Sequence, residues 1–125
     1  MDNRTHLKNI LIEKSVKLGD FTLSSGKKSN FYLDCRTTTL DAAGAYYTGL
    51  CVIEALQHLK PYPLAIGGLT LGADPIVSAV AALSHQMHAE KKIIAPVSAF
   101  IVRKETKKHG MQNLIEGWQI GRAHV

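Results

Sequence analysis

The 125-residue sequence predicts one α/β domain with a parallel sheet, on three observations. Two short apolar runs, 64–66 and 97–102, are typical of strands buried on both faces. Between them a glycine-bearing loop leads into a helix that is expected to run to about residue 89. The resulting order of strand, loop, helix and strand is a βαβ unit, whose two strands are parallel with a right-handed crossover. The length suits one domain, and 46% hydrophobic with 20% charged residues is ordinary globular composition.

The region before the first buried strand is predicted to begin with a helix. Apolar residues at helical spacing indicate an amphipathic helix from about Thr5 to Leu18, with Gly19 as its C-terminal cap. After it we expect a short extended piece over 21–23, a turn over 24–26 and a strand over 30–36.

The second predicted helix covers 41–59. Thr39 and Asp41 are both suitable N-caps for it. Gly44 and Gly49 weaken the helix, and close packing would explain them. Its buried face is expected to consist of Tyr46, Leu50, Ile53 and Leu56.

The third predicted helix begins in the loop after the first buried strand. Asp74 is suited to its N-cap and Pro75 to its first position. Ligands of parallel α/β sheets bind at the carboxyl ends of the strands. The glycine-bearing loop over 67–75 and the cationic segment that starts at Arg103 both follow such ends, so both are candidate functional segments.

The net charge of +5 favours an anionic partner. The basic segment carries no aromatic residues for stacking on bases, so we expect a small phosphorylated substrate rather than nucleic acid. No apolar stretch is long enough to cross a bilayer and no signal peptide is visible, which predicts a cytoplasmic protein without a membrane partner. Cys35 and Cys51 are expected to be buried free thiols.

Each candidate segment also has an ordinary structural interpretation. The loop over 67–75 matches neither common phosphate-binding motif, and a plain strand-to-helix turn explains it equally well. The run over 103–110 is equally compatible with a solvated loop. For 24–32 the pattern favours a hairpin turn with Phe31 or Tyr32 in the core over a surface that binds a planar anion. His85 and His88 have metal-ligand spacing, but no neighbouring ligand supports a metal site.

Three segments taken together resemble the orotate phosphoribosyltransferases, a family of type I phosphoribosyltransferases. FTLSSGKKSNFY (21–32) is similar to the family's N-terminal substrate segment, and GLTLGADP (68–75) to its first phosphate-side loop. RKETKKHG (103–110) resembles its mobile catalytic loop, and IEG (115–117) the exit from that loop. The resemblance covers about residues 5–118 in order and spacing. It implies a Rossmann-like parallel sheet with flanking helices and an N-terminal hood segment.

The resemblance also implies a reaction. The family transfers ribose 5-phosphate from 5-phosphoribosyl 1-diphosphate (PRPP) to orotate, which yields orotidine 5′-phosphate and diphosphate in pyrimidine synthesis. Mg²⁺ is required and binds mainly through PRPP, so no residue is assigned to the metal. The enzymes are homodimers, in which Lys104 would reach into the neighbouring subunit's site. The implied catalytic residues are Lys104, Lys107 and His109.

The implied binding residues follow from the same segments. Orotate would contact Tyr32 and Leu33. The residues that would bind PRPP are Arg103, Lys104, Lys107, His109, Thr70, Leu71 and Ser24. Some members of the family carry Lys at the position of Ser24 and a Tyr-Lys pair at the positions of Thr70 and Leu71. Those cations are absent here, so the contacts are expected to come from backbone or hydroxyl groups.

The end of the sequence departs from the family. Its PRPP signature, two acidic residues followed by a Thr/Gly loop, should come after Gly117, and no such segment is present. Residues 120–125 match the translation of a sequencing-library adapter. We therefore expect 1–118 to be the N-terminal part of one phosphoribosyltransferase domain, 119–125 to be a non-native tail, and the chain by itself to be inactive. Losing Arg122 with that tail lowers the net charge from +5 to +4.

Two alternative functions remain open from the sequence. One is a phosphoribosyltransferase for another nucleobase. The other is a non-catalytic module that binds nucleotides or nucleic acid through the basic segment, and its binding would weaken steeply with salt.

Overall fold

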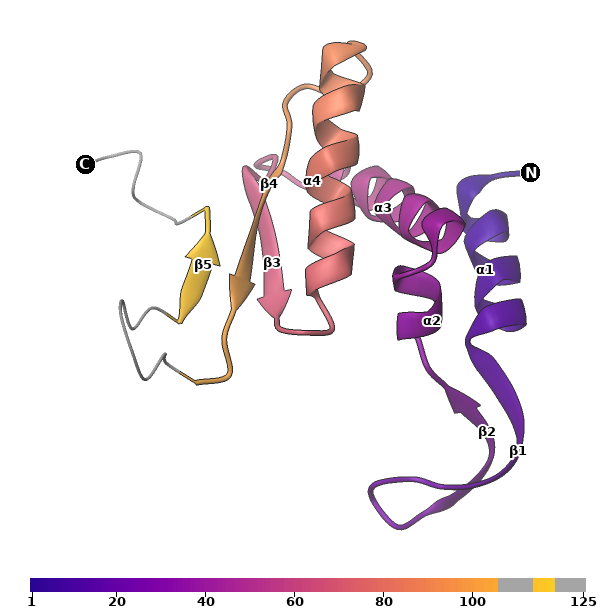
Figure 1. The fold of residues 1–125 in the computed structure, drawn as a ribbon. Helices are drawn as coiled ribbons and strands as arrows, with labels where there is room; N and C mark the ends of the chain where they lie inside the picture. The colour runs from indigo at the N-terminus through magenta and orange to yellow at the C-terminus, as the bar shows by residue number, and fades with distance from the viewer. Residues whose placement is uncertain (106–113, 119–125) are drawn as a thin grey trace. The chain divides into compact units, whose positions relative to one another are not determined.

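The computed structural model describes residues 1–105 and 114–118, in two compact units. The N-terminal unit is Met1–Thr48 and the C-terminal unit is Gly49–Val125. In chain order the elements are α1 (Asn3–Lys14), β1 (Val16–Thr22), β2 (Lys28–Leu33), α2 (Arg36–Thr39), α3 (Ala42–Leu56), β3 (Ala65–Leu69), α4 (Asp74–Ala89), β4 (Ser98–Val102) and β5 (Ile115–Gly117) (Figure 1). None of the helices in the described ranges has the length and apolar character needed to cross a membrane.

The first helix is shorter than the sequence predicts. Asp2 caps α1 by accepting a hydrogen bond from the Thr5 amide at 2.8 Å, and the helix ends at Lys14. Leu18 lies in strand β1 with 82% of its surface exposed, and Gly19 adopts φ +150° within that strand instead of capping a helix. The predicted last turn is therefore wrong, because the side chain that carried the helical pattern there faces solvent.

Strands β1 and β2 form an antiparallel hairpin in the N-terminal unit. Their register pairs Val16 with Leu33 and Thr22 with Lys28, with a bulge between Leu18 and Phe21. The predicted turn over 24–26 is confirmed at the tip of the hairpin. The second strand begins two residues earlier and ends three residues sooner than predicted, because α2 already starts at Arg36.

Buried hydroxyl groups tie the end of α1 to α2. The Ser15 side chain is fully buried and shares hydrogen bonds with the hydroxyls of Thr37 and Thr38. The Thr37 hydroxyl donates to the Lys14 carbonyl at 2.7 Å. These bonds satisfy polar groups that burial would otherwise penalise.

Helix α3 is capped by Asp41, one of the two predicted caps. Its carboxylate accepts a hydrogen bond from the Gly44 amide at 2.9 Å and one from the Lys14 ammonium at 2.7 Å. The bond from Lys14, followed by the one from Gly44, lowers the pKa of the Asp41 carboxyl. Tyr46 is 47% exposed, so the prediction that it belongs to the buried face is wrong, whereas Ile53 is buried.

The C-terminal unit contains the predicted βαβ unit. Strands β3 and β4 are parallel, with Ala65 opposite Ser98 and Leu69 opposite Val102, and α4 packs against both (Figure 1). Strand β5 then pairs antiparallel with β4, with Val102 opposite Ile115. No strand is predicted there from the sequence, because three residues are too few to show strand periodicity.

The core of this unit lies between the sheet, α4 and the second half of α3. Its buried members are Ile53, Val80, Ile93 and Val97. Gly49 lets α3 approach α4 closely, since a Cβ there would lie 2.6 Å from Leu83 Cδ1, and Gly67 leaves room on the sheet for the ring of Phe100, its partner on β4.

The two cysteines are both free thiols, as predicted. Cys51 is half-buried, but Cys35 is exposed, so the prediction of burial is wrong for Cys35. Cys35 lies at the N-cap position of α2, between the hairpin and the helix, and the apolar residues near it in sequence do not cover it.

Ser84 joins α4 to the start of β4, and we predict that this bond is needed for stability. Its hydroxyl is fully buried, accepts from the Val97 amide at 2.9 Å and lies 2.9 Å from the Ala81 carbonyl. Ser84→Ala leaves a buried amide without its acceptor and should lower the free energy of unfolding by about 1–3 kcal/mol. Denaturant unfolding measures this, with the exposed Ser78→Ala on the same helix as control. Equal stability of the two variants would contradict the prediction.

Candidate functional site

The carboxyl ends of β3 and β4 lie at one edge of the sheet in the C-terminal unit. Figure 1 shows both arrowheads at this edge, followed by the connection to α4 and by the segment that begins at Arg103. The sequence places its two phosphate-side candidates after these strands, and the structure brings them to the same edge. We call residues 70–73 the edge loop.

The four backbone amides of the edge loop differ in whether they have a hydrogen-bond acceptor within the described ranges. The Thr70 amide donates to the Val102 carbonyl at 3.0 Å, and the Ala73 amide donates to the Leu69 carbonyl at 3.0 Å. Within the described ranges the amides of Leu71 and Gly72 have no acceptor. A Cβ on Gly72 would meet nothing within 4 Å, and the Leu71 side chain is 78% exposed. Two adjacent backbone amides without acceptors, in a loop with open space beside it, are donors that an anion could use.

The start of α4 differs by one residue from the prediction. Asp74 is the first helical residue, Ala73 takes the N-cap position without a side-chain bond, and Pro75 follows Asp74. Instead of capping the helix, the Asp74 carboxylate accepts a hydrogen bond from the Thr70 hydroxyl, with 2.6 Å between the two oxygens. Sequence patterns do not reveal this bond, because an acidic residue before a proline has the same signature in either role. The peptide bond between Thr70 and Leu71 is cis.

Arg103 lies directly after β4 and is fixed by β5. Its amide donates to the Leu114 carbonyl at 2.7 Å, which closes the base of the segment between the two strands. Its side-chain Nε lies 3.3 Å from a carboxylate oxygen of Glu116, and the two side chains are 37% and 32% exposed. The terminal guanidinium nitrogens have no other partner in the described ranges, so they can bind an anionic ligand in the forked geometry of arginine.

The remaining residues of the cationic segment are only partly described. Lys104 is exposed, and it has no partner within the described part of the chain. Lys107 and His109 lie outside the described residues. Residues 119–125, the predicted non-native tail, lie outside them as well.

The candidate orotate residues belong to the hairpin of the N-terminal unit. Tyr32 and Leu33 lie on β2, 42% and 49% exposed, and Ser24, which is predicted to contact PRPP, lies in the turn of the same hairpin. The Tyr32 ring stands 5.7 Å from the Phe21 ring at 35°. Phe31 is 52% exposed, so the alternative that Phe31 or Tyr32 fills the core is wrong. An exposed aromatic surface on this hairpin can instead face a planar ligand.

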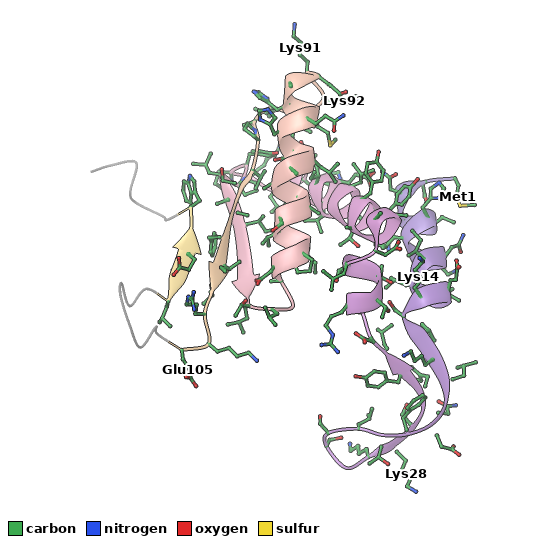
Figure 2. The ribbon with its side chains drawn as sticks, in the orientation of Figure 1. Met1, Lys14, Lys28, Lys91, Lys92 and Glu105 are labelled. Carbon is green, nitrogen blue, oxygen red and sulfur yellow. The ribbon has the colours of Figure 1, made fainter. Side chains whose placement is uncertain are left out.

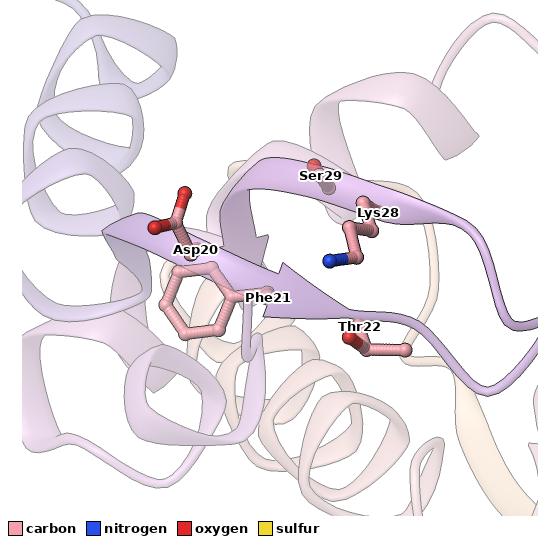
Figure 3. A pocket seen from close by; sticks show the side chains of 5 residues that line it. All are labelled: Asp20, Phe21, Thr22, Lys28 and Ser29. Carbon is pink, nitrogen blue, oxygen red and sulfur yellow. The ribbon is translucent and has the colours of Figure 1, made fainter.

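A small open pocket lies on the same hairpin. Figure 3 shows the side chains that line it: Asp20, Phe21, Thr22, Lys28 and Ser29. The aromatic ring, the ammonium group and the hydroxyls suit a planar anion, whereas the carboxylate of Asp20 opposes one. Asp20 was not predicted as a site residue, because no local motif in the sequence marks it.

No metal cluster is present in the described ranges, where no three His, Cys, Asp or Glu side chains are grouped to hold an ion. His88 instead has its Nδ1 3.2 Å from the Ile93 carbonyl oxygen. This bond joins the last turn of α4 to the segment that precedes β4.

Comparison with known proteins identifies curated relatives that share one name, orotate phosphoribosyltransferase, although no family model matches the chain. The chain is 45% identical to an orotate phosphoribosyltransferase of Thermosynechococcus vestitus, over 93% of this chain and 57% of that protein. A second orotate phosphoribosyltransferase, from Corynebacterium glutamicum, is 44% identical over 94% of this chain and 58% of its own length.

Solved structures agree with the curated relatives. A crystal structure of Mycobacterium tuberculosis orotate phosphoribosyltransferase in complex with Fe(III) dicitrate superposes with a TM-score of 0.73 at 35% identity, over 95% of this chain and 62% of that chain. The same enzyme in complex with PRPP superposes with a TM-score of 0.67 at 31% identity.

These similarities confirm the expected fold class. The α/β fold, with its parallel strand pair and flanking helices, is the one found in phosphoribosyltransferases. The chain is homologous to the N-terminal part of curated orotate phosphoribosyltransferases and spans about 57% of the length of the first of them.

Proposed function

We propose that the chain forms the N-terminal part of an orotate phosphoribosyltransferase. The observation that carries this proposal is the 45% identity to a curated enzyme of that name over 93% of the chain. The enzyme would transfer ribose 5-phosphate from PRPP to orotate, with formation of orotidine 5′-phosphate and diphosphate. During this step the bond from C1′ to the diphosphate oxygen breaks, and a bond from C1′ to a ring nitrogen of orotate forms. Orotate arrives as an anion, so no strong base is needed.

The edge of the sheet would bind the diphosphate side of PRPP. Negative charge grows on the diphosphate as the bond to C1′ breaks, and preorganised donors near that charge stabilise the transition state. The free amides of Leu71 and Gly72 and the terminal nitrogens of Arg103 are suitable donors. Lys104 adds a mobile charge. Lys107 and His109 are proposed for the same role by resemblance.

Thr70 contributes to this site as a support and not as a donor. Its amide and its hydroxyl proton are both used inside the protein, on Val102 and Asp74. The proposed contacts of the edge loop with PRPP therefore come from backbone amides, one of the two kinds of contact that the sequence predicts.

The hairpin would bind orotate. Tyr32 and Leu33 are exposed on β2, close in sequence to Lys27 and Lys28, whereas Ser24 in the turn stays a proposed contact of PRPP. An aromatic surface next to ammonium groups complements a flat carboxylate ligand.

Mg²⁺ would enter this site with PRPP. The described residues provide no cage of carboxylates, and Mg²⁺ typically binds through substrate phosphates with few protein ligands. When bound, the ion would neutralise charge on the diphosphate. We further propose a cytoplasmic homodimer as the working form, in accordance with the resemblance.

The test of this function is an assay of an extended chain. We define the extended chain as residues 1–118 continued by the C-terminal part of a curated relative. With PRPP and Mg²⁺ it should consume orotate and release diphosphate, whereas the 125-residue chain should not, because it spans only 57% of the relative. Preference for another nucleobase would contradict the orotate assignment. Polyanion binding that weakens steeply with salt, without turnover, would favour a nucleic-acid-binding module.

A further inference from the structure

The bond between Thr70 and Asp74 has a consequence for the edge loop. Thr70 connects three elements: it follows β3, its amide donates to the last residue of β4, and its hydroxyl donates to the first residue of α4. An ionised carboxylate only accepts hydrogen bonds, so the Thr70 hydroxyl must be the donor. The side chain of Asp74 therefore determines how the loop leaves the sheet.

The second oxygen of Asp74 shows that this arrangement has a cost. Asp74 Oδ1 is buried and has no hydrogen-bond partner in the described part of the chain. A buried acceptor without a partner is unfavourable, and a group of this kind needs an explanation. The carboxylate also stands beside a loop proposed to bind an anion, where its charge alone would weaken binding. A gain in the geometry of the loop would account for both costs.

We propose that Asp74 is a positioning residue for diphosphate binding: it holds Thr70 and thereby keeps the amides of Leu71 and Gly72 directed toward the anion. The inference rests on the proposed function, since it takes the diphosphate of PRPP as the ligand of the edge loop. Asp74 itself does not touch the ligand. The two loop amides that lack acceptors follow Thr70 directly, so loss of its anchor would release them first.

The test is a titration of the 125-residue chain with inorganic diphosphate, followed through the NMR amide signals of Leu71 and Gly72. In the parent chain both signals should shift and saturate. Asp74→Ala and Thr70→Val should each weaken binding about tenfold, since each removes the same charge-assisted bond. The double variant should bind no worse than either single variant, because the two residues act through one bond. Glu90→Ala, at the other end of α4, is the matched control and should bind as the parent does.

Conservative variants separate positioning from charge. Asp74→Asn keeps an acceptor for Thr70, and Thr70→Ser keeps the donor, so neither variant should show the tenfold loss of diphosphate binding. If Asp74 acted only through its charge, Asp74→Asn and Asp74→Ala would both bind more tightly. Three results would overturn the inference. They are tighter binding in both Asp74 variants, unchanged binding in Asp74→Ala and Thr70→Val, and Leu71 and Gly72 amide signals that do not shift when diphosphate is added to the parent. Diphosphate binding as expected, with no orotate turnover by the extended chain, would instead refute the proposed function alone.

Discussion

Replacing Gly44 with alanine should destabilise the N-terminal unit by more than about 4 kcal/mol, the range reached when a substitution cannot be accommodated. A Cβ at this position would lie 2.8 Å from the Thr38 carbonyl carbon and closer still to its oxygen. This neighbour is backbone, and Thr38 is held by its buried hydroxyl bond to Ser15. Relief of the clash would require α2 to move away from the first turn of α3. That movement would also strain the cap that Asp41 forms on the Gly44 amide.

Thermal unfolding followed by circular dichroism measures this effect. Gly72→Ala is a matched control, because the same methyl group there meets nothing within 4 Å. Its melting temperature should stay close to that of the parent. A Gly44→Ala variant that melts with the parent would show that the packing of α2 on α3 is looser than the structure describes.

The sequence predicts the βαβ unit well because its signals are independent of one another. An apolar run, a glycine-bearing loop and a later apolar run each favour the same connection, and β3, α4 and β4 follow that order. Asp41 and Gly44 are also interpreted correctly, since capping and close packing leave a mark at single positions. Signals of this kind remain when the tertiary context is unknown.

The errors arise where local pattern and tertiary context compete. Leu18 continues the apolar spacing of α1, but the chain turns into β1 after the buried Ser15, whose hydroxyl bonds to α2 lie outside any local pattern. Strand β5 exists because β4 offers it a partner, and three residues show no period of their own. Asp74 is a residue type that often caps helices, but its carboxylate instead accepts a hydrogen bond from Thr70, four residues earlier.

The candidate site is predictable in its parts but not in its bonds. Resemblance selects Arg103, Lys104 and Thr70 as site residues, and the structure places all three after the carboxyl ends of β3 and β4 (Figure 1). The resemblance does not reveal that Glu116 pairs with the Nε of Arg103 or that Asp74 accepts a hydrogen bond from the Thr70 hydroxyl. Both partners are acidic residues in a site proposed for an anion, and their charge by itself would argue against such a site.

Replacing Lys104 with alanine should lower the turnover of the extended chain about 100-fold or more, with little change in melting temperature. Lys104 is exposed and has no partner within the described ranges, so its removal leaves no buried group without a partner. Removing one positive donor from a developing anion typically costs this much in turnover. Lys92→Ala is the control, since Figure 2 shows Lys92 at the end of α4 opposite to the edge loop. Equal turnover of Lys104→Ala and the parent would remove Lys104 from the proposed mechanism.

Subunit mixing tests whether Lys104 acts across the proposed dimer. Arg103→Ala and Lys104→Ala should each be nearly inactive alone. If Lys104 serves the neighbouring subunit, a mixed dimer contains one complete site, because the Lys104→Ala subunit keeps Arg103 and receives Lys104 from its partner. Random exchange makes about half of the dimers mixed, so roughly a quarter of the parental activity should return. If Lys104 serves its own subunit, both sites of the mixed dimer stay defective and no activity returns, so the recovered fraction decides between the two arrangements.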